Sequence, residues 1–199
     1  MVAKPELKLS AKLTHALRVG LGALLFFLAG CSLAKEGYRD PNMDFSSVQT
    51  IAVLPFANLS RETNAGDRLR DIFSTSLLAT GGVYVLPSGE VARGMARANV
   101  GTAATPSVED AIKLGGILKA DALITGVVRE YGEMRSGSTS ANVVAVSVQM
   151  LETQSGRTVW NATSSRGGIG FSDRLFGGGG QPMNDISEQA VNDLINQLF

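Results

Sequence analysis

Apolar residues between positions 50 and 87 recur at two different spacings, one typical of strands and one typical of helices. Thr50 to Phe56 is a short, nearly continuous apolar run with β-branched residues, which is typical of a buried strand. From Gly66 to Thr80 the apolar residues recur at helical spacing, and the pair Gly81-Gly82 ends the pattern. Val83 to Leu86 is a second apolar run, closed by Pro87. This part of the chain therefore predicts a strand, a helix and a second strand.

Two further helices are predicted before the pattern changes again. Glu90 to Asn99 is a short amphipathic stretch with Val91 and Met95 on its apolar side. Ser107-Val108-Glu109-Asp110 resembles a capping box, and it opens a helix that runs to Leu118.

Beyond residue 120 the apolar positions recur with a period of two, which predicts three strands in succession. They cover Ala122 to Tyr131, Asn142 to Leu151, and Thr158 to Ser164, with Ser155-Gly156 as a hairpin turn before the last. A final helix is predicted from about Asn184 to Leu198. The order β-α-β-α-α-β-β-β-α predicts an α/β (α+β) fold with a mixed five-stranded sheet and helices packed on it. Trp160, in the last strand, is expected to be buried in that core.

The first thirty residues have the composition of a secretory signal. Lys4, Lys8, Lys12 and Arg18 precede ten uncharged residues, 19–28. A basic segment followed by an apolar core of roughly 7–15 residues is a signal peptide, whereas a spanning helix needs about 20 apolar residues. We therefore assign residues 1–30 to a signal peptide.

The signal ends in Leu28-Ala29-Gly30-Cys31, which resembles a bacterial lipobox. The small Ala29 and Gly30 let the lipoprotein signal peptidase approach the bond before Cys31. The resemblance implies that the Cys31 thiol receives a diacylglyceryl group and that its amine receives an acyl chain, so that the protein is held in a membrane. Residues 31–47 are then the lipidated cysteine and a short polar tether, and 48–199 is the folded domain.

Charge and residue content narrow the possible chemistry further. The whole chain has 18 basic and 18 acidic residues, and the signal removes four basic residues and Glu6, so 14 basic and 17 acidic residues remain. This balance predicts no nucleic-acid partner. The only histidine, His15, is lost with the signal, and the only cysteine carries lipid. A Cys/His metal site, a disulfide and a Ser-His-Asp triad are thereby excluded, and we expect no metal, no cofactor beyond the lipid, and no enzymatic activity. Hydrolysis by carboxylates alone, through Glu62 and Asp67, is the enzymatic alternative.

Two segments are candidate partner-binding sites. Phe171, Leu175 and Phe176 are large apolar residues in a glycine-rich stretch; they either pack onto the sheet or contact a partner. Asn58 and Ser60 follow the first strand at its carboxyl end, where open α/β sheets place their binding crevice. Both residue types also suit a turn that caps the next helix. The nearby run of four glycines, 177–180, lacks the Lys-Ser/Thr that completes a phosphate loop.

Three stretches together resemble the TolB amino-terminal-domain superfamily. These are Ile51 to Ser60, Ala120 to Gly126, and Val144 to Trp160, and the resemblance covers residues 48–199. Two lipoprotein groups share this domain: the CsgG-type curli-secretion channel and the LpoB-type activator of penicillin-binding proteins. The chain has no room between Tyr131 and Asn142 for the long membrane hairpins of the first group. Its tether is also far shorter than that of the second group.

The combined interpretation is a non-catalytic, membrane-anchored lipoprotein that acts as an accessory or adaptor in cell-envelope assembly or secretion. Ser32 is not the aspartate that retains enterobacterial lipoproteins at the inner membrane, which favours the outer membrane and its periplasmic side. The expected partner is an envelope protein, and homo-oligomers are possible. Two alternatives stay open: an oligomeric CsgG-like channel or ring subunit, and an activator of a peptidoglycan synthase.

Overall fold

The computed structural model describes residues 37–101, 105–137, 139–168 and 180–199. The described part contains one mixed sheet of seven strands, in the order β1-β7-β6-β5-β2-β4, with β3 paired to β5. The strands are β1 (Gly37–Arg39), β2 (Thr50–Val53), β3 (Ala57–Asn58), β4 (Tyr84–Val85), β5 (Ala122–Ser136), β6 (Thr139–Glu152) and β7 (Thr158–Gly167). β2 runs parallel to β4 and β5, and β5, β6, β7 and β1 form an antiparallel series. The predicted α/β class and mixed sheet are confirmed, with two additional short strands.

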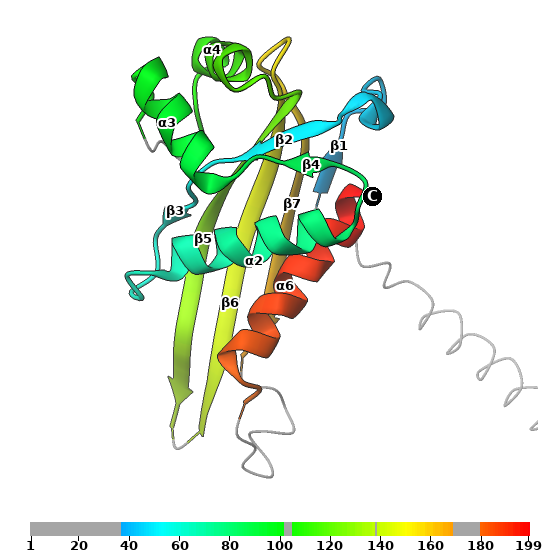
Figure 1. Cartoon of the computed structure of the whole chain (residues 1–199). Helices are drawn as coiled ribbons and strands as arrows, with labels where there is room; N and C mark the ends of the chain where they lie inside the picture. The colour runs from blue at the N-terminus through cyan, green and yellow to red at the C-terminus, as the bar shows by residue number, and fades with distance from the viewer. Residues whose placement is uncertain (1–36, 102–104, 138, 169–179) are drawn as a thin grey trace, which may run out of the picture. The chain divides into compact units, whose positions relative to one another are not determined.

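Four α-helices cover parts of the two sheet faces (Figure 1). They are α2 (Ala65–Ala79), α3 (Ser88–Ala98), α4 (Val108–Leu118) and α6 (Met183–Leu198), and a short 3-10 helix, η1 (Phe45–Ser47), precedes β2. α4 begins as predicted, because the Ser107 side chain accepts a hydrogen bond from the Asp110 amide at 3.1 Å.

Alternation along the strands divides the apolar residues between two clusters. Ile51, Val53 and Ile124 point to the face that α2 and α6 cover. Ala52 and Leu123, their neighbours in sequence, point to the opposite face, where α3 and α4 pack. The larger cluster holds Trp160, which is 1% exposed and whose indole N–H donates to the Gln197 carbonyl at 3.2 Å. The predicted burial of Trp160 is confirmed.

The folded domain begins earlier than the sequence pattern indicated. Residues 37–39, expected to belong to the tether, form β1 and pair with β7 at Trp160 to Ala162. Asp40 is buried and lies 3.5 Å from Arg157, and Met43 and Phe45 pack against the larger cluster. The tether therefore cannot extend past residue 36. The segment Gly-Tyr-Arg has no apolar run of its own, and it is a strand because β7 offers it a free edge.

The longest strands also exceed their predicted lengths. β5 and β6 continue beyond Tyr131 and start before Asn142, so that Ser136 pairs with Thr139 across a tight turn. Apart from Met134 and Ala141 the added residues are polar or glycine, and the hairpin ladder holds them. A register shift between Val128 and Glu130 changes which β5 residues face the helices in this outer part.

Candidate functional site

Most of one sheet face is left without a helix over it in the described part of the chain. α3 and α4 cover that face only at the end where Leu123 and Leu151 lie. Farther along, the residues that point to this face are mainly small or polar. They form two cross-strand rows, Thr125–Gln149–Asn161 and Val127–Ser147–Thr163. We call these six residues the open face; Thr125 is buried within it, and the other five are partly or fully exposed.

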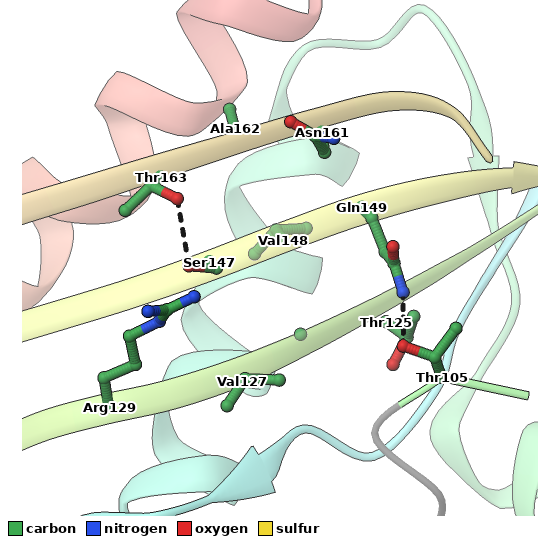
Figure 2. A pocket seen from close by; sticks show the side chains of 11 residues that line it. Thr105, Thr125, Val127, Arg129, Ser147, Val148, Gln149, Asn161, Ala162 and Thr163 are labelled. Carbon is green, nitrogen blue, oxygen red and sulfur yellow. Dashed lines mark hydrogen bonds between the residues drawn. The ribbon is translucent and has the colours of Figure 1, made fainter. Parts of the chain in front are cut away.

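The open face is hollowed and internally hydrogen-bonded. A hollow of about 320 Å³ lies over it, with Thr105 and Arg129 at its margins. Ser147 Oγ and Thr163 Oγ1 are 2.9 Å apart, and the Gln149 amide donates to Thr105 Oγ1 at 2.7 Å. Both bonds and the Arg129 side chain, which extends over the same face, are visible in Figure 2. Ordering of these side chains in advance lowers the entropy that a partner must remove on binding.

The chemistry of the open face suits binding. The residues that line its hollow include one charged side chain, Arg129, with several hydroxyl and amide groups. Ser147 is hydrogen-bonded to a second hydroxyl group, and neither hydroxyl can act as a general base at neutral pH. Hydroxyl, amide and guanidinium groups around Val127 provide hydrogen-bond donors and acceptors on a partly apolar floor.

Asn58 and Ser60 lie beside a different hollow. The Asn58 amide donates to the Glu62 carbonyl at 2.7 Å, and its Oδ1 accepts from the Ser60 hydroxyl at 2.7 Å. These bonds fix the loop that leads into α2. Ser60 and Leu59, together with the edge of β5, line a second hollow of about 600 Å³. Because their polar atoms are used within the loop, a binding role for Asn58 and Ser60 stays a prediction.

The two carboxylates of the hydrolase alternative lie in different surroundings. Glu62 lines the second hollow, whereas Asp67 lies on α2, 3.9 Å from Arg70. Arg70 is also paired with Asp71 at 2.9 Å. These ion pairs are typical of a solvated helix face.

The other predicted site residues lie outside the described residues. They are Phe171, Leu175 and Phe176, the lipidation site Cys31, and the recognition residues Leu28, Ala29 and Gly30. Gly168 and Gln181, which flank the segment with the three apolar residues, are described, and Asn142 is hydrogen-bonded to both. Its carbonyl accepts from the Gly168 amide at 2.7 Å, and its side-chain amide donates to the Gln181 carbonyl at 2.9 Å.

A charged pair fastens α6 to the helix-covered face. Arg166 on β7 donates to both carboxylate oxygens of Asp193 on α6 at 2.5 Å, and Ser164 donates to the same carboxylate at 2.9 Å. The hydrogen bond from Arg166 lowers the pKa of Asp193 despite partial burial, and that from Ser164 adds to it. The same pair raises the pKa of Arg166.

The sequence analysis did not identify the open face, although its signal was present. We used the period of two in 142–151 to select the apolar side, with Val144, Val146 and Val148. Ser147 and Gln149 are the alternate positions of that same run. Their polarity was compatible with ordinary solvent exposure, and only the positions of the helices distinguish an open face from a covered one.

Comparisons with known proteins relate the chain to lipoproteins. Residues 41–178 match the model of the GNA1162-like lipoprotein family. No curated protein matches the sequence significantly. Within the described ranges, no helix combines the length and apolar character needed to cross a bilayer.

Solved structures are similar to the chain at low sequence identity, and those with a TM-score above 0.5 share its fold. A dodecamer of a PelC variant from Paraburkholderia phytofirmans is 18% identical, with a TM-score of 0.57, 82% of this chain covered and 96% of that chain. The lipoprotein GNA1162 from Neisseria meningitidis is 21% identical, with a TM-score of 0.54 and coverages of 75% and 97%. The LpoB carboxyl-terminal domain from Salmonella enterica is 9% identical, with a TM-score of 0.48 and coverages of 64% and 87%. The broader TolB resemblance stays a prediction. On the family match, the chain belongs to the GNA1162-like lipoproteins.

Proposed function

We propose that the mature protein is a non-catalytic lipoprotein of the cell envelope that binds another protein chain through its open face. It acts as an accessory subunit in envelope assembly or secretion, on the periplasmic side of the outer membrane. Membership of a lipoprotein family supports the envelope location. The observation that carries the binding role is the open face itself, which keeps a hollow of about 320 Å³ over the central strands of the sheet.

Lipidation of Cys31 is the first part of the proposal and is tested separately. Cys31 is the only cysteine in the chain, so Cys31→Ser removes every thiol that could accept lipid. We expect the variant to lose radiolabelled palmitate and to accumulate as precursor or in the soluble fraction. Continued labelling of the variant would contradict the lipobox assignment.

A second copy of this chain is one candidate for the bound protein. The fold is shared with PelC, whose solved structures are dodecamers. Repetition of one heterologous contact generates a closed ring when the rotation closes. The second candidate function is therefore a homo-oligomeric ring subunit. No feature of the open face favours the other alternative, an activator of a peptidoglycan synthase.

Light scattering and crosslinking distinguish these possibilities. The lipidated protein in detergent is measured by size-exclusion chromatography with multi-angle scattering, and partners are captured by crosslinking in cells. The test variant is Ser147→Lys with Thr163→Lys, which places two charges in the hollow of the open face. The matched control is Asn192→Lys on the exposed side of α6.

The expected outcomes are specific to the open face. If a ring forms, the double variant should shift it to monomers; if a different protein binds, its crosslink should be lost. The control should change neither result. A double variant that folds, and that keeps both its oligomeric state and its crosslinks, refutes binding through this face. Phe171, Leu175 and Phe176 would then be the next surface to test, and their joint replacement by serine should remove the crosslink while leaving the melting temperature unchanged.

A further inference from the structure

The position of β1 limits how far the folded domain can be from its lipid anchor. β1 is fixed by pairing with β7, at Gly37 with Ala162 and at Arg39 with Trp160. Arg39 also donates to the Leu198 carbonyl at the end of α6. Six Cα steps separate Gly37 from Cys31, and whatever their conformation they span at most about 22 Å. A lipid on Cys31 therefore keeps this particular strand close to the membrane surface.

The elements around β1 belong to one end of the sheet. Figure 1 shows the carboxyl-terminal ends of α2 and α6 at this end, together with β1 and the start of β4, which are the two opposite edge strands of the sheet. The contacts agree, because α2 packs against both α6 and β4, and Arg39 reaches the last turn of α6. The tip of the β5–β6 hairpin lies elsewhere. Val148 is in register with Ala162, which in turn pairs with Gly37. Thr139, at the tip of the hairpin, lies nine positions before Val148 on β6, which is about 30 Å of extended strand.

Of the eight large apolar side chains that are exposed in the described residues, three lie at the β1 end, on or beside the helix ends: Leu78 and Tyr84 are each 56% exposed, and Phe199 is 62% exposed. Tyr38 is 43% exposed, but it pairs with Asn161 and so faces the open-face side of the sheet. Leu78 lies in the last turn of α2, and Phe199 follows the residue that Arg39 contacts. We call Leu78, Tyr84 and Phe199 the anchor-side surface. Large apolar residues concentrated on one surface of a soluble domain mark an interaction site, and tyrosine is enriched where a protein meets the bilayer interface.

The far end of the hairpin has a different character. Glu133 and Arg135 are exposed there and form an ion pair at 3.0 Å, and hydrogen bonds from Ser140 and from Arg135 lower the pKa of Glu133. Charged pairs of this kind stay hydrated, because removing them from water is unfavourable. One large apolar side chain of this hairpin, Met134, is also exposed, at 41%.

We infer that the domain rests on the membrane through its anchor-side surface, with a phospholipid bilayer as the occupant of that surface and the β5–β6 hairpin directed away from it. The inference rests on the proposed lipidation of Cys31 and adds an orientation to it. Two independent observations agree: the short covalent distance from Cys31 to β1, and the exposed Leu78, Tyr84 and Phe199 at the same end. The open face is then presented beside the membrane, where a neighbouring copy or another envelope protein can reach it.

Fluorescence quenching by brominated lipid tests this orientation. Because Cys31 carries lipid, an engineered cysteine is the only free thiol and can be labelled with an environment-sensitive fluorophore. The labelled positions are Tyr84→Cys and Phe199→Cys on the anchor-side surface, with Met134→Cys on the hairpin as the matched control. Each mature, lipidated protein is reconstituted into phosphatidylethanolamine–phosphatidylglycerol vesicles that contain dibrominated phosphatidylcholine.

The result expected is quenching at positions 84 and 199 that is several-fold stronger than at position 134. Equal quenching at all three positions, or stronger quenching at 134, overturns the orientation. Flotation of the same samples separates this result from failure of the anchor. Protein that floats without preferential quenching refutes the orientation alone, whereas protein that does not float refutes lipid attachment and the orientation with it. Circular dichroism of each labelled variant confirms that it is folded.

Discussion

The two faces of the β5–β7 sheet are made by the same strands but differ in what covers them. On the helix-covered face, Ile124, Met150 and Trp160 are at most 2% exposed. On the open face, the neighbouring residues Ser147 and Asn161 belong to the same strands but have no helix over them. Burial is therefore set by what packs on a face, and not by the strand that provides it. Stability should depend on one face and binding on the other.

The largest effect is expected where the helix-covered face is densest. Trp160→Ala removes a fully buried ring and its hydrogen bond to Gln197. We expect a loss of about 3–5 kcal/mol in the free energy of unfolding, measured by urea denaturation. On the other face of the same strand, Ser165→Ala should change it by less than about 0.5 kcal/mol. Similar losses for the two variants would show that the faces do not differ as described.

Replacement of either of two glycines, Gly126 and Gly116, by alanine should change the free energy of unfolding by a smaller amount, with opposite signs at the two positions. A side chain at Gly126 would lie 3.0 Å from the Phe56 ring, under α2. Gly126→Ala should therefore reduce the free energy of unfolding by roughly 1–3 kcal/mol. Gly116 on α4 has open space around it, so Gly116→Ala should raise stability by about 0.5–1 kcal/mol through helix propensity. A stabilising Gly126→Ala would mean that Phe56 does not pack on this face.

The smallest effect concerns the pair that fastens α6 and depends on pH. The pKa of Asp193 is lowered in the folded protein, so its charge adds stability above the unfolded pKa, and that contribution is lost as pH falls through the folded pKa. Asp193→Asn should cost less than about 1 kcal/mol at neutral pH, because Arg166 is partly exposed. The difference from the natural protein should shrink as pH falls through the folded pKa of Asp193.

The control for this pH dependence is on the same helix. Glu188 is exposed on α6, and Glu188→Gln should leave the pH profile of the unfolding free energy unchanged. If the Asp193→Asn difference stays constant down to low pH, the contribution of this residue is not electrostatic, and packing of α6 on β7 would explain it instead.

The sequence alone determined the order of the main elements and the α/β class. Local patterns were sufficient because each main helix and strand carries its own periodicity, as the apolar alternation of 144–150 does. The Ser107 cap and the burial of Trp160 were predicted for the same reason. These features depend on residues that are close in the chain.

The tertiary structure alone decided the edges of the sheet and the identity of the open face. β1 is a strand because β7 has a free edge about 120 residues later in the chain, and its three residues have no apolar period to reveal it. Ser147 and Thr163 lie on an open face because α3 and α4 stop short of them, although nothing in their own neighbourhood specifies this. Hydrophobic periodicity records which side of an element is buried, but the area that a helix covers depends on where distant segments pack.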